Sequence, residues 1–282
     1  MCGLDADTAS ADIQPAWRAD VWEDMRMRPT FREIYTQLLS RVDAGRWWPA
    51  ATRFEMMIGA VLVQHTAWRN VESSLELLDA RGLLDARAIC DAEQEEIIAA
   101  IRPSGFMRAK SRTCREVAEW TLRRQEAPMP NMTGAQSRRT DPEVTESSEG
   151  AAKGFDSEGI HLRGFDSKRL DPERALAEAV AVLSDEQLRD ELLALVGVGP
   201  ETADVIALYA FRRPAFIWDS YARRMLAALG YEVPDGYERA RAELGQFVAG
   251  EGFSVEEFAT FHGLIVEAGK QARAAGGWDN FL

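Results

Sequence analysis

The sequence is poor in the residues that build metal centres and disulfide frameworks. Only three cysteines and three histidines occur among 282 residues. An odd number of widely separated cysteines provides neither a disulfide framework nor a metal-binding quartet, and the histidines lack the spacing of metal ligands. We therefore predict neither a metal ion nor any other cofactor. These residues are Cys2, Cys90, Cys114, His65, His161 and His262.

The sequence also lacks an apolar run long enough to span a bilayer. Its N-terminal region shows no basic segment followed by an apolar one, as a secretory signal would. We therefore expect a soluble, cytoplasmic protein with no membrane partner. A chain of 282 residues is long enough for one large domain or two modest domains with a proper core.

Patterns typical of β-strands are sparse, whereas apolar residues recur three and four positions apart along most of the chain. Residues 54–63 are almost continuously apolar, which predicts a central buried helix. Ser184 before Asp185 is typical of a helix N-cap. The sequence therefore predicts an all-α fold. The expected helices cover residues 31–42, 54–63, 71–78, 92–101, 110–122, 170–183, 185–195, 202–211, 220–229, 237–248 and 255–272.

Two segments depart from the helical pattern. Residues 125–169 are rich in Pro, Ser, Thr, Gly and charged residues, which predicts a disordered insertion. Within it the tetrapeptide at 154–157 recurs at 164–167, as a local duplication or a small partner-binding motif. Residues 1–16 are expected to form a flexible tail.

The net charge of −13 argues against generic binding of nucleic acid. Basic residues nevertheless concentrate between residues 101 and 124, and again near residue 219. Such a local basic face can bind a polyanion with salt-sensitive affinity. The same residues are equally typical of solvated helix faces. They are Arg102, Arg108, Lys110, Arg112, Arg115, Arg123, Arg124, Arg212, Arg213, Arg223 and Arg224.

A glycine-rich turn at Gly197, Val198 and Gly199 precedes an apolar helix. Glycine permits a positive φ and lets another backbone approach closely. The first amides of the following helix have no helical partner and suit a phosphate oxygen. The turn is therefore interpreted either as a phosphate-binding hairpin or as a tight connection between two helices.

The run from Leu192 to Gly230 resembles the helix-hairpin-helix signature of the endonuclease III superfamily of DNA glycosylases. In that family a glycine hairpin is followed by an apolar helix, a short strand-like segment and an aspartate that opens the next helix. The corresponding residues are 197–199, 202–211, 215–218 and Asp219.

The resemblance implies two helical domains with a DNA-binding cleft between them. A contiguous bundle would cover residues 53–213, interrupted by the insertion at 125–169. The second, discontinuous domain would combine residues 14–52 with residues 214–282.

Asp219 corresponds to the family's catalytic carboxylate. A carboxylate there stabilises the positive charge that develops on the sugar and can activate water. Taken alone, an aspartate at a helix start is most often an ordinary N-cap. The resemblance also implies which residues bind the DNA backbone. They are Gly197, Val198, Gly199, Glu201, Thr202 and Arg223.

Glu201 departs from the pattern of the bifunctional family members. Those members place a lysine here, which forms a Schiff base with the sugar and then drives strand cleavage. A glutamate cannot form an imine, so the sequence predicts a monofunctional enzyme that uses water. Many members also carry four clustered cysteines near the C-terminus, and their absence here predicts that there is no iron–sulfur cluster.

Trp47 and Trp48, together with residues 64–72, resemble the endonuclease-III-like 3-methyladenine DNA glycosylases. The resemblance implies a base pocket of Trp47, Trp48 and Trp68, with Gln64 filling the gap that a flipped base leaves. Stacking of a cationic base on tryptophan contributes about 0.5–2 kcal/mol. The alternative for the tryptophan pair is packing in the core.

The loop of Gly105 and Phe106, with Lys110 beyond it, resembles the family's loop before a basic helix. The resemblance implies that this loop contacts the DNA backbone.

The sequence therefore predicts a monofunctional DNA glycosylase of base excision repair that acts on alkylated purines, with 3-methyladenine as the expected base. Its expected partner is double-stranded DNA with a damaged base, bound by a monomer that is nucleoid-associated when on DNA. Two alternatives stay open. One is a bifunctional lyase acting on oxidised pyrimidines, and the other is a non-catalytic protein that binds DNA damage.

Overall fold

The computed structural model describes residues 28–45, 48–126 and 167–281. These ranges contain helices and connecting loops but no strand, which confirms the predicted all-α class. The helices are α2 (Phe31–Arg41), α3 (Arg53–Leu62), α4 (Trp68–Asp79), α5 (Ala86–Asp91), α6 (Gln94–Ala100), a short 3₁₀ helix η2 (Arg102–Ser104), α7 (Met107–Glu126), α8 (Ser167–Ala181), α9 (Asp185–Leu193), α10 (Pro200–Phe211), α11 (Ser220–Ala228), α12 (Tyr237–Ala249), α13 (Val255–Ala274) and α14 (Trp278–Phe281).

The predicted tail at 1–16 lies outside the described residues, as do Trp47 and residues 127–166 of the predicted insertion. At the ends of that insertion, α7 extends to Glu126 and α8 begins at Ser167. The two helices pack against each other, so the insertion leaves and re-enters the bundle at neighbouring helices.

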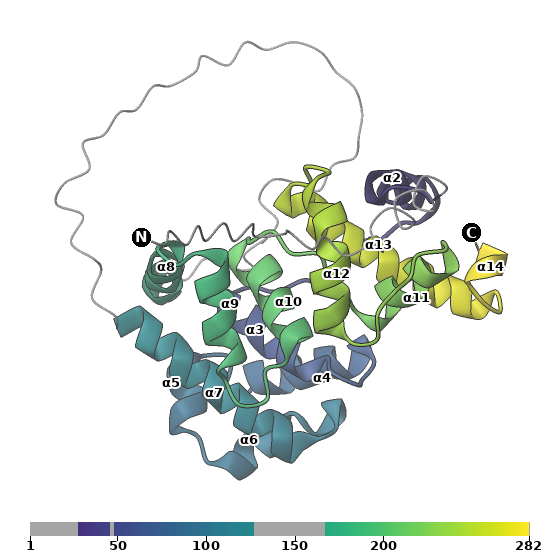
Figure 1. The fold of residues 1–282 in the computed structure, drawn as a ribbon. Coiled ribbons are helices and arrows are strands. Elements are labelled where there is room, and N and C mark those ends of the chain that lie inside the picture. The colour runs from purple at the N-terminus through teal and green to yellow at the C-terminus, as the bar shows by residue number, and fades with distance from the viewer. Residues whose placement is uncertain (1–27, 46–47, 127–166, 282) are drawn as a thin grey trace, which may run out of the picture.

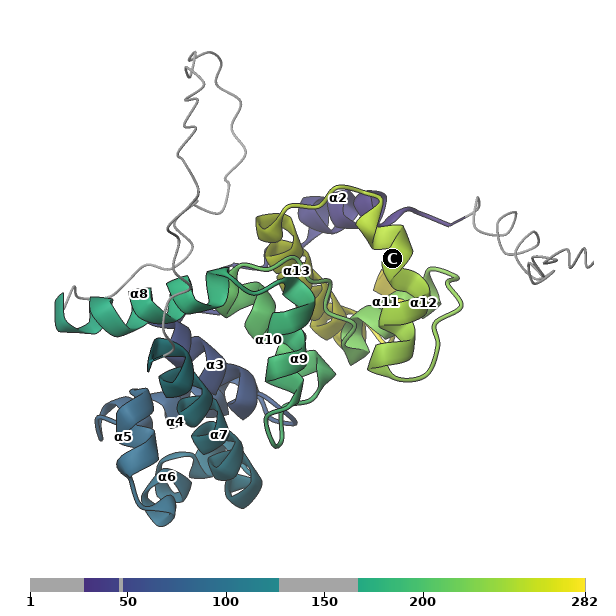
Figure 2. The same ribbon diagram turned by 60° about the vertical axis from the view of Figure 1, so that its left-hand side comes forward.

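The helices fall into two groups (Figure 1). Helix α7 packs against α3, α5, α6 and α8, while α13 packs against α2, α11 and α14. Helix α10 contacts α3 and α9 on one side and α12 and α13 on the other. Figure 2 shows α9 and α10 between the two groups. The helix that follows the glycine hairpin therefore joins both halves of the molecule.

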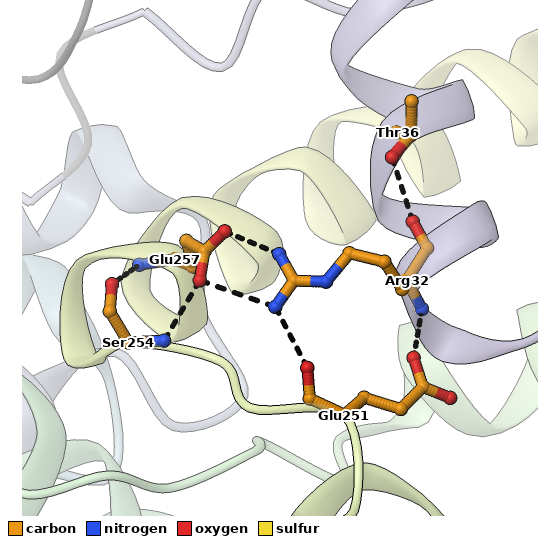
Figure 3. A network of polar contacts seen from close by, with 5 residues as sticks. All are labelled: Arg32, Thr36, Glu251, Ser254 and Glu257. Carbon is orange, nitrogen blue, oxygen red and sulfur yellow. Dashed lines mark hydrogen bonds and ion pairs between the residues drawn. The ribbon is translucent and has the colours of Figure 1, made fainter.

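A polar network holds the N-terminal helix α2 against the beginning of α13 (Figure 3). The Arg32 guanidinium donates to the Glu257 carboxylate and to the Glu251 carbonyl, and it lies 3.8 Å from the centre of the Phe253 ring. The Glu251 carboxylate accepts the backbone N–H of Phe31 at 3.0 Å. Because the ion pair is partly exposed, we expect it to contribute only about 1 kcal/mol or less. The network thus orients α2, and the aromatic packing of Phe31 against Phe216 holds this helix in place.

An aromatic cluster lies beneath the segment that leads to Asp219. The Phe216 ring lies 5.3 Å from Phe31, 4.5 Å from Trp218 and 5.4 Å from Phe261. The resemblance implied a strand-like segment here, but residues 212–219 are irregular and pair with no strand among the described residues. The segment is held in place by burial of Phe216, Ile217 and Trp218 and not by hydrogen bonds to another strand.

Candidate active site

The glycine hairpin connects α9 to α10 and packs against α7. Gly197 has a φ of +87°, and a Cβ at this position would lie 2.0 Å from the Thr113 hydroxyl oxygen. Both conditions require glycine. Gly199 has a φ of −92°, and an added Cβ there would meet nothing within 4 Å. Val198 between them is buried. Folding of the chain therefore explains Gly197 but does not explain Gly199.

Helix α10 begins with Pro200 at its first position, and Gly199 supplies no side-chain cap for its amides. The Thr202 side chain is buried, and its hydroxyl accepts a hydrogen bond from the Gln64 amide. Gln64 follows the C-terminal end of α3. The two predicted site residues therefore meet, and they tie the end of α3 to the first turn of α10.

Asp219 is the N-cap of α11 and is only 7 % exposed. Its Oδ1 accepts the backbone N–H of Ala222 at 2.7 Å, which satisfies one amide of the first turn. Its Oδ2 lies 3.8 Å from Nε2 of His262 on α13, a separation too long for a hydrogen bond. Asp219 therefore acts as an N-cap through one oxygen and keeps the other oxygen for a different contact.

His262 and Tyr209 form a second polar group beside Asp219. The Nδ1 atom of His262 lies 2.8 Å from the Tyr209 hydroxyl oxygen, which also donates to the Ala259 carbonyl at 3.1 Å. His262 is buried, and Tyr209 lies in the second half of α10, which is otherwise apolar. Sequence reasoning missed both residues, because an apolar helical pattern gives no sign of a hydroxyl that points toward another helix.

Glu201 lies in the same electrostatic neighbourhood. Its side chain reaches solvent, yet the protein walls around the carboxyl desolvate it enough to raise its pKa. The negative charge of Asp219 raises that pKa further, while His262 and Arg223 oppose the rise. Arg223 contributes a buried Nε that has no hydrogen-bond partner among the described residues. Two carboxylates and an arginine with an unused donor thus lie together at the N-termini of α10 and α11.

Aromatic rings approach this site from the other side. The Trp48 ring stacks on Tyr209 with centroids 5.3 Å apart and an interplanar angle of 23°. Trp68 lies 5.3 Å from Trp48 at an angle of 60°. Gly59 on α3 makes room for the indole, because a Cβ there would lie 3.3 Å from Trp48 Nε1. The structure therefore brings Trp48 and Trp68 together beside the helix that carries Glu201.

Four non-glycine residues among those described have a positive φ, and one of them, Arg212, is the C-cap of α10. Trp48, His65 and Phe106 have φ values of +54°, +55° and +47°. Each such residue costs about 1–3 kcal/mol and persists only where the surrounding structure holds it. Phe106 is 68 % exposed, and its ring lies 6.2 Å from that of His65. A large apolar side chain is thus presented to solvent on a strained loop.

Lys110 is a structural residue. It is buried, and its ammonium group donates to the carbonyls of Leu62 at 2.8 Å and Ser104 at 2.7 Å. Burial lowers its pKa. The implied contact between Lys110 and DNA is therefore wrong, because the side chain joins the end of α3 to η2 instead of facing solvent.

The basic residues of the 101–124 segment separate into two sets. Arg115 donates to the carbonyls of Cys90 and Ala92, Arg123 lies 3.8 Å from Glu119, and Arg124 pairs with Glu191. The other set makes no ion pair or hydrogen bond through its side chains within the described ranges. It comprises Arg102, Arg108 and Arg112. Only this second set has charge that intramolecular contacts do not use.

A cavity of about 550 Å³ lies between α9, α10, α12 and the start of α13, and it does not include Asp219. Asp204 and Arg189 in its wall are already paired at 2.6 Å. Arg213 in the same wall pairs with Asp185 and donates to two carbonyls. These polar groups hold helices together, so we place the candidate site at Asp219 rather than in this cavity.

The described residues contain no group of three or more His, Cys, Asp or Glu side chains placed to hold a metal ion. None of the described helices is both long and apolar enough to cross a membrane.

Comparisons with known proteins agree with this geometry. Residues 58–249 match the model of the HhH-GPD superfamily of base excision DNA repair proteins. The Methanocaldococcus jannaschii protein MJ1434, whose name assigns it provisionally to the DNA repair glycosylases, is 28% identical over 83% of this chain and 84% of its own. Endonuclease III of Sulfolobus acidocaldarius is 31% identical over 86 residues, which cover 30% of this chain and 37% of that protein.

Among solved structures, the fold is similar to that of the H. pylori 3-methyladenine DNA glycosylase MagIII, whose crystal structure contains 1,N6-ethenoadenine. The TM-score is 0.53 at 21% identity, over 89% of this chain and 96% of that one.

A hairpin, a following buried helix and an aspartate at the next helix N-terminus define a helix-hairpin-helix protein of the DNA glycosylase class. The family match covers more than half of the chain, and the chain belongs to the HhH-GPD superfamily of base excision DNA repair proteins. DNA is the substrate of this family.

Proposed function

We propose that the protein is a monofunctional DNA glycosylase that hydrolyses the N-glycosidic bond of alkylated purines, with 3-methyladenine as the main base. Asp219 is the proposed catalytic carboxylate. The observation that carries the proposal is that a glutamate, Glu201, stands in the first turn of α10, where a lyase would need an amine, with the charge of Asp219 close enough to raise its pKa. The acting species is a monomer on double-stranded DNA, in the cytoplasm and at the nucleoid while bound.

The lysine side chains that the structure describes supply no usable amine, which supports water as the nucleophile. These are Lys110 and Lys270, whereas the side chains of Lys153 and Lys168 lie outside the described part of the chain. Lys110 is bound to the carbonyls of Leu62 and Ser104, and Lys270 pairs with Glu267 at 3.1 Å. Formation of an imine requires an unprotonated amine that reaches the sugar. Neither lysine is placed for that reaction beside Asp219.

The proposed reaction breaks the bond between the sugar C1′ and the base nitrogen. The electron pair leaves with the base, the sugar gains oxocarbenium character, and water adds to C1′ and loses a proton. The Oδ2 atom of Asp219 stabilises the positive charge and orients the water. A methylated purine is cationic and leaves as a neutral base, so the reaction needs little acid catalysis.

The proposed base pocket is formed by Trp48 and Trp68. Their rings lie at stacking distance from each other and beside α10. Trp47, the remaining member of the proposed pocket, lies outside the described residues. A flipped cationic purine would gain about 0.5–2 kcal/mol from such a π surface. The similarly folded H. pylori enzyme, which is named for 3-methyladenine, supports this choice of base.

The proposed DNA path runs over the hairpin and along α7. Gly199 faces open space, which lets a phosphate approach the uncapped amides of α10. Arg108 and Arg112 are one helical turn apart on α7, and Thr113 beside them packs against Gly197. Arg223 is half-buried near the two carboxylates, and its guanidinium group is the third proposed phosphate contact. Phosphates held by these groups would place the damaged nucleotide at Asp219.

Phe106 and Gln64 have distinct proposed roles in the opened duplex. Phe106 is exposed on its strained loop and is supported by His65, so we assign it the apolar wedge that separates neighbouring bases. Gln64 lies at the edge of the gap left by the flipped base. Its amide bonds to Thr202, which fixes the gap relative to the hairpin.

The division of the chain into a bundle at 53–213 and a second domain at 14–52 plus 214–282 is part of the proposal. The two groups of helices seen in the contacts support it. DNA would lie across the cleft between the two domains, with Asp219 at its mouth.

The proposal is tested by the bases that the protein releases. Methylated duplex DNA is incubated with the protein, and the released bases are separated and identified by mass. We expect 3-methyladenine as the main product. Release of only oxidised pyrimidines, from a parallel oxidised duplex, would contradict the assigned specificity. Binding of both duplexes without release of any base would identify a non-catalytic damage-binding protein instead.

A further inference from the structure

We propose that Tyr209 and His262 form a positioning relay that connects the aromatic base pocket to the Asp219 carboxylate. The proposal rests on the proposed function, because it assigns a role within the same site. Throughout, "the relay" means the side chains of Tyr209 and His262.

The relay begins at the base pocket. The Tyr209 ring lies face to face with Trp48, with centroids 5.3 Å apart. The hydroxyl at the far end of the same ring meets His262 Nδ1 at 2.8 Å and the Ala259 carbonyl at 3.1 Å. One side chain therefore stacks on a ring of the proposed base pocket and also makes a polar contact with α13.

The relay ends at the oxygen that Asp219 keeps for chemistry. The Ala222 amide holds Oδ1 at 2.7 Å, whereas Oδ2 faces His262 Nε2 at 3.8 Å. That separation is too long for a hydrogen bond, so the imidazole attracts Oδ2 without capping it. Both side chains are buried, and their electrostatic attraction is therefore stronger than it would be in water. Oδ2 stays oriented, yet able to face the sugar.

The protons of the relay follow from counting donors. Tyr209 has one hydroxyl proton, which it gives either to the Ala259 carbonyl or to Nδ1 of His262. If the hydroxyl donates to Nδ1, the one proton of the neutral imidazole lies on Nε2; if it donates to the Ala259 carbonyl, Nδ1–H must donate to the hydroxyl oxygen and Nε2 carries a lone pair. The Asp219 carboxylate favours the first arrangement, because a lone pair on Nε2 would face a negative oxygen. The hydroxyl of Tyr209 therefore sets the ring plane, and the Nε2–H group faces the catalytic carboxylate.

The first test is independent of catalysis and uses the nitrogen NMR shifts of the imidazoles in the whole ¹⁵N-histidine-labelled protein at pH 7.5. The His262 signals are assigned by their loss in His262→Asn. We expect a protonated Nε2 whose shift changes in Asp219→Asn and in Tyr209→Phe. The control Tyr231→Phe removes a distant buried hydroxyl that donates to the Pro29 carbonyl, and it should leave these shifts unchanged. An unprotonated Nε2, or shifts insensitive to Asp219→Asn, would overturn the relay.

The second test measures the single-turnover rate of base release and the affinity for duplex DNA with an abasic-site analogue. His262→Asn retains an amide near Nδ1 but offers no donor to Oδ2, and we expect a rate about 10- to 100-fold lower with unchanged affinity. His262→Gln can place an N–H near the Nε2 position and should recover part of the rate. Tyr209→Phe keeps the stacked ring and should also slow release.

A double-mutant cycle separates a relay from two independent packing effects. If Tyr209 acts through His262, then Tyr209→Phe with His262→Asn should be no slower than His262→Asn alone. Multiplicative losses, or rates of both single variants within twofold of wild type, would overturn the relay. Failure of the proposed function is distinguishable, because wild-type protein would then release no methylated purine while the nitrogen shifts would still report on the relay.

Discussion

The chain carries two buried aspartates near the same helix, and they are used in opposite ways. Asp204 on α10 is 3 % exposed and accepts hydrogen bonds from Arg189 at 2.6 Å and Tyr237 at 2.9 Å, with Arg241 3.8 Å away. Asp219 is 7 % exposed and accepts one hydrogen bond from the described residues, a backbone amide. The first carboxylate is saturated by the protein, whereas the second keeps an oxygen available.

The surroundings of Asp204 show what a structural carboxylate looks like. Burial opposes the charge on Arg189, but its hydrogen bonds to Asp204 and Glu238 outweigh that cost and raise its pKa. Burial and the Asp204 charge raise the pKa of Tyr237 as well, so its hydroxyl stays a donor. These contacts join α9, α10 and α12. A carboxylate with satisfied oxygens stabilises the fold, whereas the carboxylate of Asp219, with an unused oxygen, remains available for the proposed reaction.

The largest expected effect is that of Asp219→Asn. Asparagine is also a good N-cap, so the free energy of unfolding should change by less than about 1 kcal/mol. Loss of the negative charge should lower single-turnover base release about 100- to 10,000-fold. Rates are measured on methylated duplex DNA, with thermal unfolding as the control. A variant that keeps at least a tenth of the wild-type rate would remove Asp219 from the mechanism.

The same substitution at Asp204 should have the opposite signature. Asp204→Asn leaves Arg189 buried without its charged partner, which should cost about 3–5 kcal/mol of unfolding free energy. Base release, measured at a temperature where the variant is folded, should stay within a few-fold of wild type. Urea denaturation gives the stability. If Asp204→Asn were stable and inactive, the contrast between the two aspartates would be lost.

The two glycines of the hairpin offer the same contrast between a structural residue, Gly197, and a residue that folding does not require, Gly199. Gly197→Ala places a Cβ against Thr113 at a positive φ, so it should lower the unfolding free energy by about 1–3 kcal/mol or more. Gly199→Ala meets no protein atom, so stability should hold while affinity for abasic-analogue DNA falls several-fold. Fluorescence anisotropy measures the affinity. Equal effects of both substitutions on folding would indicate that the hairpin is only a helix connection.

The smallest effect is expected for single arginines of α7. Arg112→Ala should lower the slope of log affinity against log salt concentration by about 1, as expected for loss of one phosphate contact. Arg115→Ala is the matched control, because its guanidinium already donates to the Cys90 and Ala92 carbonyls. Its salt slope should not change. An unchanged slope for Arg112→Ala would place the DNA path elsewhere.

Much of this architecture is visible in the sequence because it depends on local patterns. The Ser184 capping box, the hairpin and the Asp219 N-cap are all present where the sequence indicates them. The short helix α5, with its six residues, is too brief for an apolar periodicity to reveal. The beginning of α4 at Trp68 was also missed, because its N-cap Ala67 makes no side-chain cap.

The residues that sequence reasoning misplaced or missed depend on contacts between distant segments. The sequence places Lys110 in a basic helix, yet its ammonium group donates to two carbonyls of other elements, those of Leu62 and Ser104. In the sequence, Tyr209 and His262 lie among apolar residues of two separate helices. They come together near Asp219 because α10 packs against α13. A sequence pattern reports which face of a helix is apolar, but not which polar atom of a neighbouring helix it meets.

One measurement tests the central claim most directly: counting bases, strand breaks and covalent adducts in a single reaction on methylated duplex DNA with borohydride present. Hydrolysis assisted by Asp219, with Glu201 at the position of the lyase amine, predicts stoichiometric release of free 3-methyladenine, intact strands and no protein–DNA adduct. A borohydride-trapped adduct with strand breaks in proportion to the released base would contradict the account.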